Sequence, residues 1–123
     1  MRIRNANIYT EEHRFVRGDA AVENGRFVSC TGDPAGEEAV VDAEGMYLIP
    51  GLVDIHSHGA VNADASDGDA EGLRKMSRYY AQKGVTSWCP TTMTLSEEQL
   101  LTAMHAIRDF TSDGANCVGV HLE

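Results

Sequence analysis

The chain has 123 residues, enough for one ordinary domain, and its 42% hydrophobic and 24% charged residues are typical of a soluble globular protein. Ten basic residues against 19 acidic ones give a net charge of -9, which argues against a nucleic-acid partner because a polyanion binds to a basic face. No apolar run reaches membrane-spanning length, and the N-terminus has no secretory pattern. We therefore expect no membrane partner and a cytoplasmic location.

The cysteines also indicate a reducing compartment. Cys30, Cys89 and Cys117 are odd in number and stand in apolar surroundings. A disulfide framework normally uses an even number of cysteines, whereas buried thiols are ordinary in cytoplasmic proteins. We expect all three to be buried and reduced. We expect none of them to be a catalytic nucleophile, because no histidine is placed nearby to activate one.

Residues 1–49 predict a small antiparallel β (sandwich) domain. The clearest signal is the hairpin of residues 20–28, in which Asn24 and Gly25 accept the positive φ angles of a type I′ turn. The other predicted elements, in order, are a strand over 3–9, a polar turn over 11–14, a loop over 31–38, a strand over 40–42, a turn over 43–45 and a strand over 46–48. Short strands joined by turns favour a single small β unit.

After Pro50 the pattern changes to β-α-β-α-β. The predicted elements are a strand over 52–56, a loop over 59–68, a helix capped by Asp67 or Asp69 and ending near Lys83 and Gly84, a strand over 85–89 stopped by Pro90, a helix opened by the capping box Ser96–Gln99, and a strand over 117–122. The first strand is nearly all apolar, as expected for a strand buried on both faces of a parallel sheet. The helices carry apolar stripes at Leu73, Met76, Tyr79, Tyr80 and Lys83, and at Leu100, Leu101, Met104, Ile107 and Phe110.

This order predicts an α/β fold in which residues 50–123 form the start of a (β/α)8 TIM-type barrel. Each β-α unit is about thirty residues long, the usual size of such a unit. A closed barrel needs eight units, whereas two units and one further strand are present. We therefore expect an incomplete barrel preceded by the small β domain.

Two histidines stand at the C-terminal end of the first barrel strand. His56 and His58 are separated by one residue, and side chains at i and i+2 of an extended chain point to the same side. Neutral imidazoles are good ligands for zinc and similar divalent ions, and active sites of parallel barrels lie at the C-terminal strand ends. A His-x-His pair alone is weak evidence, but this context favours a metal site. We expect His13 to be solvated and His105 to lie on the surface.

Three stretches resemble known proteins. Residues 42–59, which include Ile-Pro-Gly-Leu-Val-Asp-Ile-His-Ser-His-Gly, resemble the opening of the amidohydrolase superfamily of metal-dependent hydrolases. Within it, residues 84–92 and 119–123 are similar to the second and third barrel strands of the N-acetylglucosamine-6-phosphate deacetylase family. The resemblance implies a β domain split between the two termini beside a (β/α)8 barrel. It also implies that this chain is the N-terminal third of a longer protein.

The resemblance further implies a reaction and a ligand set. The reaction is metal-dependent hydrolysis of the acetamide of N-acetylglucosamine 6-phosphate, giving glucosamine 6-phosphate and acetate. The implied metal ligands are Glu123, His56 and His58, with zinc, iron, manganese or cobalt as the metal and room for a second ion. The acid–base aspartate would lie beyond Glu123, so no catalytic residue is expected among these residues. The implied partners are a small amino-sugar phosphate and, for the complete protein, a second copy in a homodimer.

Some alternatives stay open. His121 should share the face of Glu123 and is interpreted as a residue packed beside the ligands, with ligation as the other reading. The complete protein could instead be a cyclic amidase or a nucleobase deaminase of the same superfamily, although a glutamate ending the third strand favours the deacetylase. As a different class, these residues could act only as a non-catalytic structural module.

Overall fold

The computed structural model describes residues 1–28 and 39–123, which form two compact units, Met1–Pro50 and Gly51–Glu123. Cys30 and the predicted loop over 31–38 lie outside the described residues. Among the helices in the described part of the chain, neither has the length and apolar character needed to cross a membrane.

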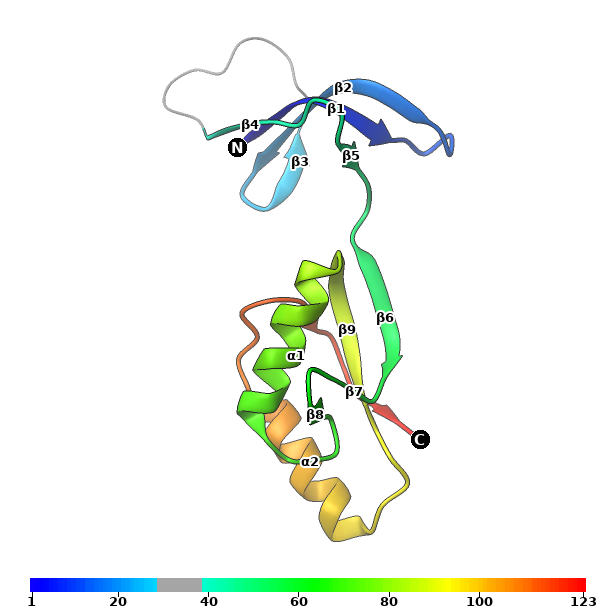
Figure 1. Ribbon diagram of the computed structural model, residues 1–123, viewed down its shortest axis with the longest axis vertical. Helices are drawn as coiled ribbons and strands as arrows, with labels where there is room; N and C mark the ends of the chain where they lie inside the picture. Colours follow the sequence, from blue (N-terminus) through cyan, green and yellow to red (C-terminus); the bar gives the residue numbers. More distant parts are fainter. Residues whose placement is uncertain (29–38) are drawn as a thin grey trace. The chain divides into compact units, whose positions relative to one another are not determined.

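The first unit is a five-stranded mixed sheet (Figure 1). Its strands are β1 Arg2–Tyr9, β2 Phe15–Glu23, β3 Arg26–Val28, β4 Val40–Asp42 and β5 Tyr47–Leu48. The strand order is β3-β2-β1-β4, and β5 also pairs with β1. Asn24 and Gly25 have φ angles of 50° and 73°, which confirms the predicted tight hairpin between β2 and β3.

The prediction that this unit is antiparallel is wrong for two of its strands. β4 and β5 both pair in parallel with β1, with Arg2 opposite Val40 and Asn7 opposite Tyr47. Val40, at the start of β4, lies opposite Arg2, at the start of β1, and both strands run onward from there in the same direction. Residue patterns alone gave no sign of this direction, because a short edge strand looks the same in either orientation.

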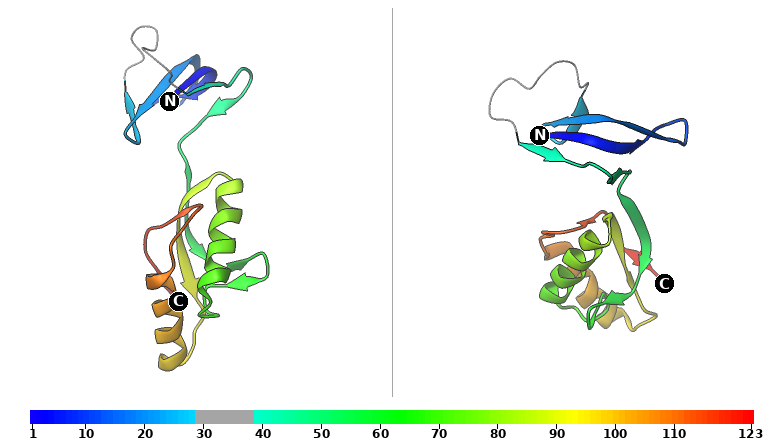
Figure 2. Two further views of the ribbon diagram at one scale, coloured as in Figure 1. Left: turned by 90° about the vertical axis from the view of Figure 1, so that its left-hand side faces the viewer. Right: turned by 45° about the horizontal axis from the view of Figure 1, so that its top comes forward.

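The second unit is built on a parallel sheet with β9 in its centre (Figures 1 and 2). Its elements are β6 Leu52–Ser57, β7 Gly59–Ala60, β8 Ala63–Asp64, α1 Ala70–Gln82, β9 Val85–Thr92, α2 Glu97–Asp109, β10 Asn116–Cys117 and β11 His121–Leu122. β6, β10 and β11 all pair in parallel with β9. The predicted β-α-β-α-β order is therefore confirmed. The predicted loop over 59–68 contains the short β7–β8 hairpin, which sequence patterns did not indicate.

The core of this unit lies between the sheet and its two helices. Its centre is Trp88 of β9, which is fully buried. The buried cluster around it consists of Leu73, Met76, Tyr80, Trp88, Ile107, Phe110 and Ala115. Both helices begin at predicted caps: the Asp69 side chain accepts the Glu71 N–H, and Ser96 forms the predicted capping box with Gln99. Leu101, predicted to be buried, is instead 48% exposed.

The strands of this unit are covered on one face only, as expected where a barrel is incomplete. Val53 and Ile55 of β6 are 63% and 67% exposed, and Val118, next to β10, is 58% exposed. The helices cover only the side of the sheet on which Trp88 lies (Figure 2). Among the described residues of this unit no helix covers the other side, and β6 pairs with β9 alone, so apolar side chains of β6 are exposed.

The predicted stop at Pro90 is also wrong, because β9 continues through it to Thr92. Proline removes one N–H but is compatible with extended backbone where the ladder is irregular. Here the β6 register shifts between Asp54 and Ser57, and on the other side residues 118–120 separate β10 from β11. The ladders on both sides of β9 are thus interrupted near the proline.

Candidate metal centre

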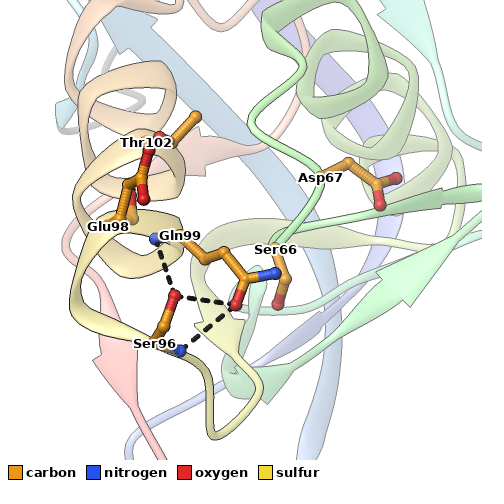
Figure 3. A pocket seen from close by; sticks show the side chains of 6 residues that line it. All are labelled: Ser66, Asp67, Ser96, Glu98, Gln99 and Thr102. Atoms are coloured by element: carbon orange, nitrogen blue, oxygen red, sulfur yellow. Dashed lines mark hydrogen bonds between the residues drawn. The ribbon is translucent and has the colours of Figure 1, made fainter.

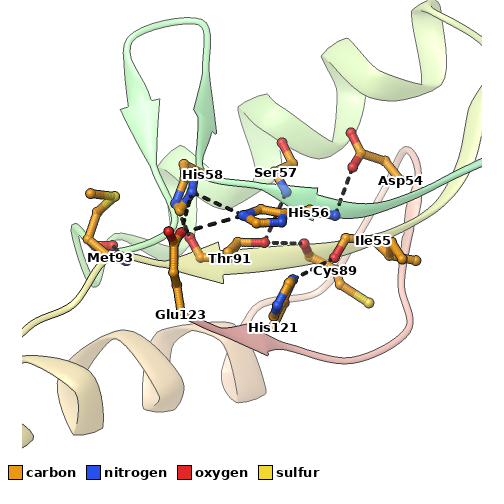
Figure 4. Close-up of polar contacts among 11 residues, drawn as sticks. Asp54, Ile55, His56, Ser57, His58, Cys89, Thr91, Met93, His121 and Glu123 are labelled. Carbon is orange, nitrogen blue, oxygen red and sulfur yellow. Dashed lines mark hydrogen bonds and ion pairs between the residues drawn. The ribbon is translucent and has the colours of Figure 1, made fainter.

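The C-terminal ends of β6 and β11 bring three predicted ligands together (Figure 4). His56 and His58 project from one side of β6, whereas Ser57 between them hydrogen-bonds to Tyr80 of α1 on the other side. This alternation is the expected geometry of an extended strand. Glu123 follows directly after β11 and turns its carboxylate toward both imidazoles.

The distances suit a small cation. His56 Nε2 lies 3.3 Å from His58 Nε2, and Glu123 Oε2 lies 3.5 Å from the first of these nitrogens and 2.8 Å from the second. Ligand atoms of a tetrahedral zinc site with bonds of about 2.0–2.2 Å lie roughly 3.3–3.5 Å apart. Two of the three separations already match, and the third is shorter by roughly half an ångström on this comparison. All three side chains are partly exposed, so the remaining adjustment is a small movement.

A hydrogen bond defines which nitrogen of His58 faces the cluster. Its Nδ1 lies 3.2 Å from the carbonyl oxygen of Thr91. A carbonyl only accepts, so Nδ1 carries the hydrogen, and in the neutral ring Nε2 then has a lone pair. That lone pair points at the Glu123 carboxylate, and two electron-rich atoms at this distance repel one another. A cation bound between them, either a metal ion or a proton, removes the repulsion, so the donor set fits a divalent metal.

Thr91 contributes a second contact that the sequence did not reveal. The residue is fully buried, and its hydroxyl accepts the N–H of Ser57 at 2.9 Å while donating to the carbonyl of Cys89 at 3.3 Å. Thr91 therefore binds the Ser57 amide through its hydroxyl and the His58 ring through its backbone carbonyl. A threonine near a strand end has no distinctive pattern, and this contact depends on the register between β6 and β9.

His121 of β11 lies beside the three ligands. Its Nδ1 is 3.0 Å from the carbonyl oxygen of Ile55, and its ring centroid is 4.4 Å from that of His56. It is not part of the group of His56, His58 and Glu123, whose ligand atoms lie within 4.8 Å of one another. The structure thus places His121 on the face of Glu123, as its spacing in the sequence predicted.

The remaining candidate residues lie apart from this cluster. His105 is exposed on α2, and His13 is exposed and hydrogen-bonded to the Tyr9 hydroxyl, as predicted. Cys89 and Cys117 are free thiols, but they are half-buried and not fully buried. Burial raises the pKa of the Cys117 thiol, which makes it a poor nucleophile at neutral pH.

A polar pocket lies between the loop after β8 and the start of α2 (Figure 3). Its lining residues are Ser66, Asp67, Ser96, Glu98, Gln99 and Thr102. The Ser66 hydroxyl accepts the N–H of Met93 at 2.9 Å and so ties together the loops that follow the first two barrel-type strands. Sequence analysis did not single out this pocket.

Active sites of parallel (β/α) barrels lie at the C-terminal ends of the strands, which is where this chain carries the cluster of His56, His58 and Glu123. No family model matches the chain. The chain is homologous to N-acetylglucosamine-6-phosphate deacetylases, including the one from Bacillus subtilis, with 28% identity over 98% of this chain and 33% of the relative. The one from Vibrio furnissii is 37% identical over 62% of this chain and 20% of the relative. The chain therefore spans a third or less of these relatives.

The fold of the chain is similar to part of a solved deacetylase structure. The crystal structure of the N-acetylglucosamine-6-phosphate deacetylase from Thermotoga maritima matches with a TM-score of 0.70 and 29% identity, over 99% of this chain and 31% of that chain. A shorter stretch, 46% of this chain, is 40% identical to 11% of an adenine deaminase from Clostridium perfringens. The longer matches are to deacetylases.

Proposed function

We propose that the complete protein containing these residues is an N-acetylglucosamine-6-phosphate deacetylase. In this proposal it hydrolyses the acetamide of N-acetylglucosamine 6-phosphate to glucosamine 6-phosphate and acetate. Residues 1–49 are part of its small β domain, and residues 50–123 open its (β/α)8 barrel. The proposal includes a cytoplasmic homodimer without a nucleic-acid or membrane partner.

The observation that carries the proposal is the convergence of His56, His58 and Glu123 at the ends of parallel strands. The similarity to deacetylases along 98% of the chain supports the choice of reaction within the class. We propose these three residues as metal ligands, with zinc as the leading metal and iron, manganese or cobalt as others of suitable chemistry.

When bound, a divalent metal supplies Lewis-acid chemistry and a nucleophile derived from water at neutral pH. The chain's own residues orient that chemistry. Thr91 fixes the His58 ring with Nε2 toward the cluster, and Glu123 adds a negative charge to two neutral imidazoles. Partly exposed ligands at the strand ends leave an approach for a small polar substrate. We propose no catalytic acid or base among residues 1–123, and we expect these residues alone to have no deacetylase activity.

A nucleobase deaminase is the second candidate, because of the 40% identity to part of an adenine deaminase. The two reactions release different products from different substrates, so one assay separates them. We expect the complete protein to release acetate from N-acetylglucosamine 6-phosphate and no ammonia from adenine. Chelation should abolish acetate release, and added zinc, cobalt, manganese or iron should restore it. Full activity after chelation, or ammonia release without acetate release, would overturn the proposal.

A further inference from the structure

The ladder between β6 and β9 is interrupted where the first candidate ligand stands. Asp54 pairs with Trp88 and Ser57 pairs with Pro90, so the register slips between these two pairs. His56 lies within the slip. β6 has one more residue than β9 over this stretch, and the extra residue of such a bulge is left without a regular ladder partner.

Near the slip, two backbone N–H groups of β6 donate to side chains. The N–H of His56 donates to its neighbour Asp54 Oδ1 at 3.0 Å, and the N–H of Ser57 donates to Thr91 Oγ1 at 2.9 Å. Both of these side chains lie on β6 or on its direct partner. The position of His56 therefore depends on side-chain contacts in place of a continuous sheet ladder.

His121 supplies a contact from further away. It comes from β11, which pairs with β9 and not with β6, yet its imidazole reaches the carbonyl oxygen of Ile55 (Figure 4). Because a carbonyl only accepts, Nδ1 carries the hydrogen, and the neutral ring then has its lone pair on Nε2. The same ring packs edge-on against His56, with centroids 4.4 Å apart and an interplanar angle of 68°.

We propose that His121 is a positioning residue that holds His56 in the geometry needed for metal binding and is not itself a ligand. Its Nδ1–H bond fixes the backbone just before His56, and its ring limits the rotation of the His56 imidazole. The inference rests on the proposed metal site, because it assigns a role in shaping that site. It follows from the bond to Ile55 and from the position of His121 outside the group of three converging ligand atoms.

Two substitutions separate the proposed role from ligation. Asparagine places a donor near the position of histidine Nδ1, whereas glutamine places a nitrogen or oxygen near the position of Nε2. A positioning residue should therefore be rescued by His121→Asn and not by His121→Gln, and a ligand should show the opposite order. His121→Phe keeps the ring against His56 without the hydrogen bond, and His105→Asn on the exposed face of α2 is the control.

The measurement is zinc affinity by titration calorimetry, with cobalt absorption spectra to report ligand geometry. Loss of a residue that orients a ligand typically costs about 10–100-fold in metal affinity. We expect His121→Gln and His121→Phe to weaken zinc binding at least about tenfold and to change the cobalt spectrum. His105→Asn should stay within about threefold of wild type, whereas His121→Asn, which keeps the hydrogen bond but loses the ring, should bind zinc more weakly than wild type and more tightly than the other two His121 variants. If His121→Gln kept its zinc affinity and His121→Asn lost it, His121 would be a ligand. Equal zinc affinities in all variants would show that His121 has no positioning role.

A second measurement on the metal-free protein separates this inference from the proposed function. Nitrogen-15 spectra of the histidine rings should show His121 with its hydrogen on Nδ1. Hydrogen exchange at the His56 amide should be faster in His121→Gln and His121→Phe than in His121→Asn. If wild type binds no zinc, the proposed metal site fails while these signals still test the hydrogen bond. A His121 ring with its hydrogen on Nε2 would overturn the inference even if zinc binds.

Discussion

The Nδ1 atom of His58 lies 3.2 Å from the backbone carbonyl oxygen of Thr91, across the boundary between β6 and β9. This contact turns the other ring nitrogen toward Glu123. The orientation of the His58 ring therefore depends on the register between β6 and β9.

We expect Glu123→Gln to weaken zinc binding more than any other single change among the three candidate ligands. The reason is that Glu123 Oε2 is within 3.5 Å of both imidazole nitrogens and brings the only negative charge of the group. His56→Ala and His58→Ala should have smaller effects, because each leaves the carboxylate with one imidazole. Zinc affinity and metal content of each purified variant of the complete protein are the measurements.

Glu97→Gln, at the exposed start of α2, is the matched control for this change. It removes the same charge without touching the cluster. A Glu123→Gln protein that keeps its metal and its activity would contradict the assignment of Glu123.

The neighbouring threonines should respond in opposite directions to replacement by valine. Both are fully buried, but the Thr91 hydroxyl accepts the Ser57 N–H, whereas the Thr92 hydroxyl has no hydrogen-bond partner among residues 1–28 and 39–123. Thr91→Val leaves an amide unpaired and should lower the free energy of unfolding by about 1–3 kcal/mol. Thr92→Val removes an unpaired buried hydroxyl and should raise it by up to about 1 kcal/mol. Urea unfolding of the two variants checks this, and effects of the same sign would contradict it.

Gly114 should not tolerate even a methyl group. A Cβ added there would lie 2.4 Å from the carbonyl oxygen of Ser77 in α1, and backbone atoms cannot move aside like the end of a flexible side chain. Gly114→Ala should therefore cost about 1–3 kcal/mol of stability through overpacking.

Gly119→Ala is the control for that substitution, because its added Cβ would meet only Cys89 Sγ at 3.8 Å. It should leave stability unchanged or raise it by up to about 1 kcal/mol through a less flexible unfolded chain. The measurement is thermal unfolding of both variants. Equal losses of stability would show that the close approach of residue 114 to the Ser77 carbonyl does not restrict the side chain there.

Stability should fall at alkaline pH through Tyr80. Burial raises the pKa of its hydroxyl above the ordinary value of about 10, although the hydrogen bond with Ser57 opposes the shift. Between the unfolded and the folded pKa the folded state binds more protons, so the stabilisation is complete below pH about 10 and decreases as pH rises. Tyr80→Phe should lack this alkaline loss, and Tyr47→Phe, at a 66% exposed tyrosine, should retain it. The measurement is the urea midpoint of wild type, Tyr80→Phe and Tyr47→Phe from pH 8 to 11. If the midpoints of all three proteins fell in parallel with pH, the prediction would be contradicted.

The open side of the sheet should promote association of the chain as described. Val53 and Ile55 expose apolar side chains on a strand with a free edge, and such surfaces pair with other molecules. We expect oligomers by size-exclusion chromatography with light scattering, and a shift toward monomer in Ile55→Lys. Thr86→Lys, which adds the same charge at an exposed polar position, should change little. A monomeric wild type would show that these exposed side chains are harmless.

Local signals in the sequence determined the elements of this protein and the identities of its candidate ligands. The Asn24–Gly25 turn, the Ser96 capping box and the Gly84 helix end depend on residues close together in the chain, and all three are present in the structure. The spacing of His56 and His58 likewise placed both on one face of a strand, because the side-chain period of a strand is two.

Only the tertiary structure decided what depends on contacts between distant segments. The parallel direction of β4 and β5, the passage of β9 through Pro90 and the exposure of Val53 follow from which strands and helices pack together. The hydrogen bonds from the Ser57 N–H to the Thr91 hydroxyl and from the His121 ring to the Ile55 carbonyl join residues more than thirty positions apart. Neither Thr91 nor His121 carries a sequence pattern that reveals its partner. Strand register, which no short stretch of sequence encodes, is the physical reason that these contacts had to be seen in three dimensions.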